Sequence, residues 1–227
     1  MRSATKILPF VLSMIAGSVD VIGFLGLGGL FIAHITGNLV ILATKLVVGG
    51  QAPASHLLSV PVFIVALAEA RLLATRLDRL RIAALRPLLR LQFLLLLGFL
   101  ATGIAAGPRY DSNAAIIIFA AMLGVSAMAV QNALVQISLM GTPSTAVMTT
   151  NITRFALDLG DVLLGRNCGD RAKTTERAWR NGLAIAGFVA GCGLGAWCHA
   201  RAGLWSLTVP TGLSVVALAL AAAKQGS

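Results

Sequence analysis

The chain has 227 residues, of which 57% are hydrophobic and 11% are charged, and its formal net charge is +10. Soluble domains contain about a quarter charged residues, so this composition excludes an ordinary soluble domain and predicts an all-α polytopic membrane protein. In a soluble protein the positive charge would indicate nucleic-acid binding. Here the cations cluster between apolar stretches, which predicts contacts with membrane lipids and no nucleic-acid partner.

Eight apolar segments follow one another along the chain. They cover residues 7–27, 39–48, 56–74, 88–106, 114–140, 152–164, 182–199 and 204–223. Segments 39–48 and 152–164 are too short to span, because as helices they would cover about 15 and about 20 Å of a hydrocarbon core roughly 30 Å thick. We therefore predict six spanning helices and two short re-entrant half-helices.

The positions of Lys and Arg distinguish this topology from its alternative. Cations gather at the N-terminus, in residues 71–90, in residues 166–180 and at Lys224. Cytoplasmic loops carry an excess of such residues. If the two short segments re-enter, every cluster and both termini fall on the cytoplasmic side. We favour this arrangement over eight full transmembrane helices in two parallel four-helix repeats.

One short motif occurs twice. Residues 35–38 read Ile-Thr-Gly-Asn and residues 148–151 read Met-Thr-Thr-Asn, each after a glycine-containing break and before a short apolar segment. The two copies define repeats of approximately 7–107 and 114–223 within a single membrane domain of residues 1–227. Each repeat holds three spans, an odd number, so the repeats would have opposite orientations, as in many transporters and channels.

Three glycines of the seventh segment, Gly187, Gly191 and Gly195, follow one another at four-residue spacing. Small residues at this spacing allow two helices to approach closely. We predict that this segment packs tightly against another helix.

Four stretches around the two breaks form a longer pattern, residues 16–20, 31–38, 131–133 and 148–151. Together they resemble the YoaK-like family of bacterial membrane proteins of unknown function, over nearly the whole chain. The resemblance implies a location in the bacterial inner membrane. It implies no activity, substrate or catalytic residue.

Polar residues at the two short helices are candidates for a site. Asn38 and Asn151 lie at or next to the predicted helix starts, with Thr36 and Thr149 just before them. Such residues cap helices through their side-chain oxygens. Alternatively, two helix N-termini near the midplane would offer free N–H groups and partial positive charge to a polar or anionic solute. The sequence leaves both interpretations open.

Asp20 is the most informative charge, because it lies well inside the first apolar segment. Ionisable residues at that depth mark a solute pathway or a buried pair. Asp20 could therefore bind a solute or a proton, or it could tie its helix to the following break. His34 is a possible partner, and the repeat places Asn132, beside Gln131, at the position equivalent to Asp20.

The second short segment carries Arg154 and Asp158, whose spacing predicts an ion pair within one helix. No hydrolase, metalloprotease or phosphate-loop motif occurs, so we expect no enzyme of these classes. The three cysteines lack metal-ligand spacing. No metal or cofactor is expected.

The leading hypothesis is a small transporter or channel for a small polar or anionic solute. Its site would combine eight residues: Asp20, His34, Thr36, Asn38, Gln131, Asn132, Thr149 and Asn151. The alternative is a membrane scaffold or regulatory subunit in which the motifs only lock the repeats together, and an enzyme acting on lipid is a third possibility. Predicted partners are membrane lipids, the solute and a second copy of the chain.

Overall fold

The computed structural model describes residues 3–49, 54–107, 111–145, 147–165 and 171–223, and the secondary structure in this part of the chain consists of helices joined by turns and irregular segments. Some cations of the topology prediction, among them Arg166 and Lys224, lie outside it. The elements are α1 (Ser3–Gly26), α2 (Ile35–Val48), α3 (Ala54–Arg79), α4 (Leu85–Ala105), α5 (Ala115–Ser138), α6 (Met148–Leu163), α7 (Arg171–Ala202), the 3-10 helix η1 (Gly203–Leu207) and α8 (Thr208–Ala223).

Five segments are long and apolar enough to cross a membrane. They are Ile7–Gly26, Ala54–Arg79, Leu85–Ala105, Ala115–Ser138 and Arg171–Ala223, and the last contains both α7 and α8. The prediction of an all-α, multi-pass membrane protein is confirmed.

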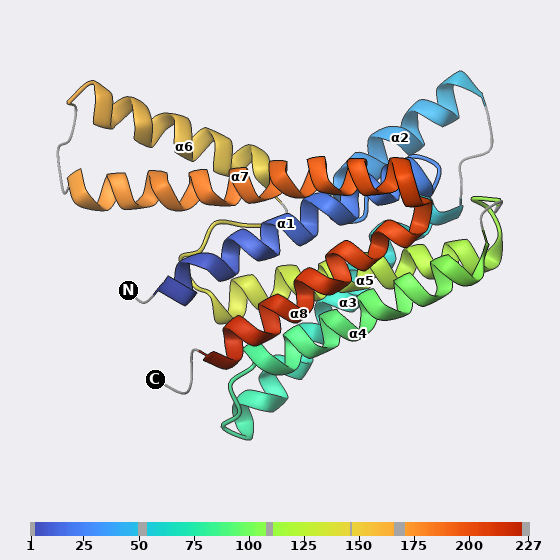
Figure 1. Cartoon of the computed structure of the whole chain (residues 1–227), viewed down its shortest axis with the longest axis horizontal. Coiled ribbons are helices and arrows are strands. Elements are labelled where there is room, and N and C mark those ends of the chain that lie inside the picture. Colours follow the sequence, from blue (N-terminus) through green and yellow to red (C-terminus); the bar gives the residue numbers. More distant parts are fainter. Residues whose placement is uncertain (1–2, 50–53, 108–110, 146, 166–170, 224–227) are drawn as a thin grey trace.

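The long helices extend between two ends of the molecule (Figure 1). Helices α3 and α6 end, and α4 and α7 begin, at the end of the molecule where α1 begins and α8 ends. Helices α2, α4 and α7 end, and α3, α5 and α8 begin, at the opposite end. Helices α1 and α5 are the most buried of the spans and form the centre of the bundle.

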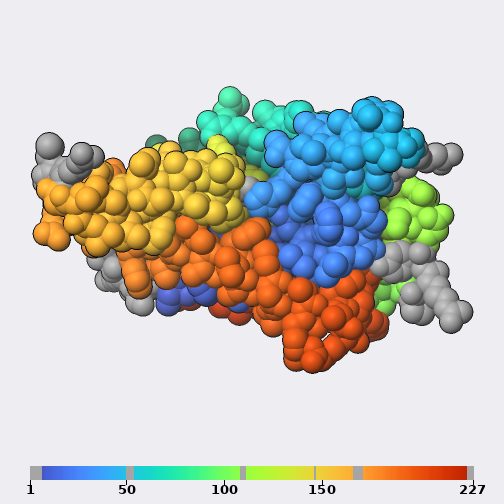
Figure 2. Space-filling model, turned by 90° about the horizontal axis from the view of Figure 1, so that it is seen from above, coloured from blue at the N-terminus to red at the C-terminus, as the bar shows by residue number. Residues whose placement is uncertain are grey.

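Helices α2 and α6 are short, with 14 and 16 residues, or about 21 and 24 Å. Both start near the middle of the molecule and run toward opposite ends (Figure 1). On the face shown in Figure 2, the α6 and α2 segments meet above α7. Each packs mainly against one long helix, α2 against α3 and α6 against α7.

Glycines with positive φ form the breaks that precede the two short helices. Gly28 and Gly29 have φ values of 69° and 86° after α1, and Gly141 has a φ of 76° after α5. This backbone region is strained for residues with a Cβ atom but open to glycine. The chain therefore leaves the helical path after α1 and after α5, and turns back toward the middle.

The glycine seam predicted from the sequence is confirmed, and its partner is α1. A Cβ atom on Gly187 would lie 2.6 Å from the carbonyl oxygen of Phe10, and one on Gly195 would lie 2.9 Å from Cα of Ser18. A Cβ on Gly191 would overlap the carbonyl oxygen of Met14. Because these neighbours are backbone atoms, α1 and α7 could not approach so closely with larger residues.

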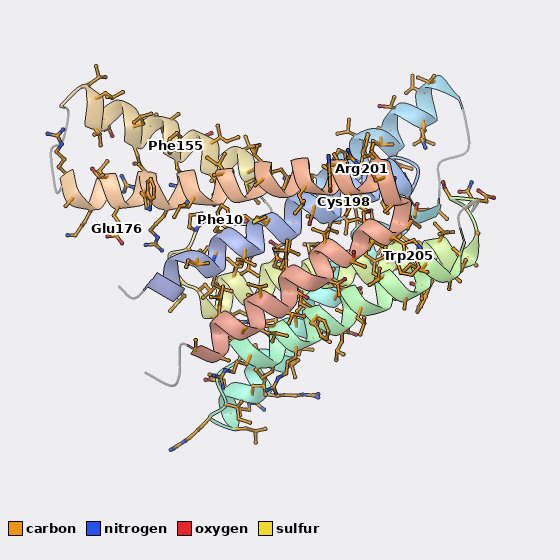
Figure 3. All side chains as sticks on the ribbon, viewed as in Figure 1. Phe10, Phe155, Glu176, Cys198, Arg201 and Trp205 are labelled. Atoms are coloured by element: carbon orange, nitrogen blue, oxygen red, sulfur yellow. The ribbon has the colours of Figure 1, made fainter. Side chains whose placement is uncertain are left out.

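Helix α6 also packs closely against a glycine, in the first half of α7. Phe155 projects from α6 toward α7 (Figure 3), where a Cβ on Gly182 would lie 3.2 Å from its ring. Glu176 and Arg201 mark the two ends of α7 in the same view.

Replacing Gly191 by Ala should destabilise the protein, because the new methyl group would push α1 away from α7. Overpacking of this kind costs about 1–3 kcal/mol. Thermal unfolding in detergent should show a lower melting temperature. Gly193→Ala is the matched control, since Gly193 lies on the same helix with nothing within 4 Å of its would-be Cβ atom. Equal melting temperatures for the two variants would contradict the packing described above.

Single cysteines at Asp78, Asn113 and Glu176, in a background without the natural cysteines, test the direction of the helices. All three positions are exposed. With six crossings, a membrane-impermeant thiol reagent should label Asp78→Cys and Glu176→Cys from one side and Asn113→Cys from the other. Eight crossings would instead place Asn113→Cys with Glu176→Cys, and Asp78→Cys opposite them.

Candidate functional site

The carboxylate of Asp20 on α1 binds the segment that leads into α2. Its Oδ1 atom accepts hydrogen bonds from the backbone N–H groups of Ile32 at 2.8 Å, Ala33 at 2.6 Å and His34 at 3.3 Å. The residue is only 3% exposed. Without this acceptor, these donors would be buried without a partner, which is costly in an apolar environment. Asp20 therefore ties the start of α2 to α1.

The second carboxylate oxygen of Asp20, Oδ2, forms a hydrogen bond with Nδ1 of His34. His34 is the residue that immediately precedes α2. Its ring also lies edge-on to Phe188 of α7, with ring centroids 5.2 Å apart. The predicted pairing of Asp20 with His34 is confirmed.

A cavity of about 420 Å³ lies beside this pair, between α1, α7 and the segment before α2. Its walls are mostly apolar and aromatic, and are formed by Asp20, Val21, Phe24, Leu25, Phe31, His34, Phe188 and Cys192. The His34 side chain is 30% exposed and the Asp20 side chain 5%. A molecule in the cavity would therefore meet the imidazole more readily than the carboxylate.

Asn38 lies in the first turn of α2 and does not cap it. Its Nδ2 atom donates to the carbonyl of Phe31 at 2.7 Å and to Oγ of Ser59 at 3.1 Å, while its Oδ1 atom accepts from the N–H of Phe31 at 2.8 Å. The residue before the helix is His34, which makes no side-chain cap. The capping interpretation is therefore wrong for Asn38, which holds the preceding segment instead.

The start of α6 is built in a similar way. Nδ2 of Asn151 donates to the carbonyl of Ser144 at 2.6 Å, seven residues earlier, as Nδ2 of Asn38 donates to Phe31. Val147 precedes α6 with φ −115° and ψ 72°, close to the −93° and 64° of His34. Asn151 is buried, so it too holds the segment before the helix rather than capping it.

Gln131 is the residue of α5 that binds the segment before α6. Its Nε2 atom donates to Thr145 Oγ1 and to the carbonyl of Leu12 on α1, both at 2.9 Å, and its Oε1 atom accepts from Gln92 at 2.6 Å. Asn132 is half-buried, and its side chain makes no hydrogen bond within the described part of the chain. A shift of one residue rotates a helical side chain by about 100°, so Gln131, not Asn132, occupies the role of Asp20.

Five of the eight candidate residues thus form two clusters instead of one site, and Asn132 joins neither cluster. The α2 cluster contains Asp20, His34 and Asn38, and the α6 cluster contains Gln131 and Asn151. Thr36 and Thr149 are exposed, so neither joins a cluster. Among the described residues, no hydrogen bond connects the side chains of the two clusters.

The predicted ion pair between Arg154 and Asp158 is wrong. Asp158 is 5% exposed and binds Arg177 of α7, with Arg177 Nε 3.0 Å from Oδ2 and Arg177 Nη2 2.6 Å from Oδ1. The spacing within α6 allowed a local pair, but Asp158 faces α7 whereas Arg154 is exposed.

Sequence reasoning also missed Ser59, Gln92 and Thr145, which complete the two clusters. Gln92 carried a signal, as an amide inside an otherwise apolar span. No group of three or more His, Cys, Asp or Glu side chains that could hold a metal occurs among the described residues.

A comparison with protein families identifies the family to which the chain belongs. The profile of DUF1275, a family of proteins of unknown function, matches residues 8–220. The chain belongs to the DUF1275 family. Searches among curated proteins and among solved structures found no match. Membership of DUF1275 agrees with the expected family of unknown function, while the bacterial inner membrane stays a prediction.

Replacing Asp20 by Ala should lower the melting temperature in detergent, because three backbone N–H groups would lose their acceptor. A buried donor without a partner costs about 1–3 kcal/mol. Asn132→Ala is the control and should melt close to the wild type, because the half-buried Asn132 side chain makes no hydrogen bond with a described residue. If both variants melt alike, Asp20 does not hold the segment before α2.

Proposed function

We propose that this DUF1275 protein is a small transporter or channel whose solute site is the cavity beside Asp20 and His34. The observation that carries the proposal is a cavity of about 420 Å³ with an ionisable pair in its wall, next to a broken helix. Ionisable groups within membrane segments are costly and usually functional. Solute sites of transporters often lie where helices are interrupted near the midplane.

We also propose that the chain consists of two inverted repeats, residues 7–107 and 114–223, in a single membrane domain. Packing contacts in one half have counterparts in the other. Helix α1 packs on α7 as α5 packs on α3, α4 packs on α5 as α8 packs on α1, and α2 packs on α3 as α6 packs on α7. The contact between α4 and α8 joins a helix to its own counterpart. This pattern supports a pseudo-two-fold axis.

In this proposal α2 and α6 are re-entrant half-helices. Their lengths of about 21 and 24 Å fall short of a hydrocarbon core of about 30 Å. Their starts near the middle of the molecule and their opposite directions support the same interpretation. Non-helical backbone at such depth must be enclosed by protein or line a cavity, as the segment before α2 does at the Asp20 cavity.

The chemistry of the cavity favours a small neutral polar or cationic solute. Asp20 already accepts hydrogen bonds from the backbone N–H groups before α2, so few donors there are left to bind an anion. The aromatic rings of Phe24, Phe31 and Phe188 line the cavity, and aromatic faces attract cations. The anionic solute expected from two free helix ends has less support.

A scaffold or regulatory role is the second candidate, and one observation favours it. The hydrogen bonds of Asp20 and Asn38 go to neighbouring protein groups, so both side chains stabilise the fold. Under this alternative, replacing His34 would change stability at most, and no solute would cross.

The deciding experiment is flux through reconstituted vesicles. Stopped-flow light scattering would follow urea, glycerol, methylammonium and formate, with protein-free vesicles as the baseline. We expect faster entry of an uncharged or cationic probe than of formate, and a loss of about tenfold or more in His34→Ala, the size of one hydrogen bond to a charged group. His199→Ala, a histidine of α7 outside the cavity, should keep wild-type flux. Wild-type vesicles that match the baseline for all four probes would favour the scaffold.

A further inference from the structure

We propose that a second cavity, between α6, α7 and the segment before α6, binds a phosphate-class oxyanion. Its volume is about 590 Å³. It is lined by Gly141, Thr142, Pro143, Arg154, Leu157, Asp158, Arg177, Arg180 and Asn181. This cavity shares no residue with the Asp20 cavity, so the inference does not depend on the proposed function.

The charges around the cavity are predominantly positive, with three arginines against one carboxylate. Arg177 is engaged by Asp158 through Nε and Nη2. Arg180 donates from Nη2 to the carbonyl of Gly141, and its other N–H groups make no hydrogen bond with a described residue. Arg154 makes no hydrogen bond within the described part of the chain. Two guanidinium groups therefore face the cavity without a carboxylate of their own.

Asn181 adds a side-chain amide to the same wall of the cavity. Asn181 is 2% exposed and lines the cavity, and its side chain makes no hydrogen bond with any described residue. Its amide therefore lies where a ligand in the cavity can reach it. An oxyanion between Arg154 and Arg180 would accept a hydrogen bond from its Nδ2 atom. Guanidinium forks match phosphate oxygens in geometry and bind them with charge-assisted hydrogen bonds.

The position of the cavity along α7 brings it within reach of two sources of phosphate. Arg177 to Asn181 come just before the apolar stretch 182–199 and directly follow Glu176, which Figure 3 shows near the start of α7. At that level a side chain meets lipid headgroups as well as the aqueous solution. The shared chemistry is a phosphate oxyanion, supplied either by free phosphate or by an anionic lipid.

Two binding measurements on the full chain distinguish these sources. The first is the melting temperature in nonionic detergent with inorganic phosphate, against sodium chloride at equal ionic strength. The second is native mass spectrometry with added phosphatidylglycerol, against phosphatidylcholine. Arg154→Gln is the main variant, because Arg154 holds no described fold contact. Arg76→Gln on α3, also exposed and outside the cavity, is the matched control. If Arg154→Gln fails to fold, Arg180→Gln carries the same comparison.

We expect phosphate or phosphatidylglycerol to bind the wild type and Arg76→Gln, and to bind Arg154→Gln about tenfold more weakly, the size of one charge-assisted hydrogen bond. Loss of phosphate binding identifies the free ion as the source, and loss of lipid binding alone identifies the headgroup. The proposal is overturned if neither probe binds the wild type more tightly than its control. Equal weakening in Arg154→Gln and Arg76→Gln would also overturn it, since that result indicates general attraction to a cationic surface.

Discussion

The structure depends on one requirement, that backbone N–H and C=O groups deep in an apolar bundle find partners inside the protein. Each short helix begins after a break where the helical hydrogen bonds stop, so the break must be satisfied by side chains. Asp20 and Asn38 do this before α2 and Asn151 does it before α6, where Gln131 binds the side-chain hydroxyl of Thr145. Asp20 and Gln131 belong to the two most buried helices, α1 and α5, so polar side chains occupy the centre of an apolar molecule.

The two halves meet this requirement with different chemistry. Before α2 the acceptor is a carboxylate with a histidine bound to it, and an apolar cavity adjoins the pair. Before α6 the neutral amides of Gln92 and Gln131 form a chain of side-chain hydrogen bonds that ends at the hydroxyl of Thr145, and all three residues are buried. Only the first cluster contains groups that can change charge. A function of the α2 cluster therefore does not require an equivalent site in the α6 cluster, even if the two halves of the chain share one arrangement of helices.

Segment length, charge and small-residue spacing were enough to predict the helical membrane fold, the two short helices and the seam on α7. The pairing of Asp20 with His34 was also predictable, because few ionisable groups lie at that depth. The neighbouring helix that a given side chain faces was not predictable from the sequence. The repeat placed Asn132 at the position equivalent to Asp20, and the helical spacing paired Asp158 with Arg154. In the structure Gln131 binds the segment before α6 and Arg177 binds Asp158. A repeat alignment leaves an uncertainty of one residue, and one residue turns a helical side chain toward a different helix.

Helices α2 and α6 differ in their charged residues, and this difference matches the opposite ends of the molecule toward which the two helices run. Helix α6 extends toward the end that holds both termini, beside the cation-bearing start of α7, and it carries Arg154, Asp158 and Asp161. Helix α2 extends toward the other end and carries Lys45 as its one charged residue. Under the proposed topology the first environment is cytoplasmic, where arginines are favoured. An arginine-lined cavity can therefore form beside α6, whereas α2 itself carries no arginine, so the two short helices provide different chemistry.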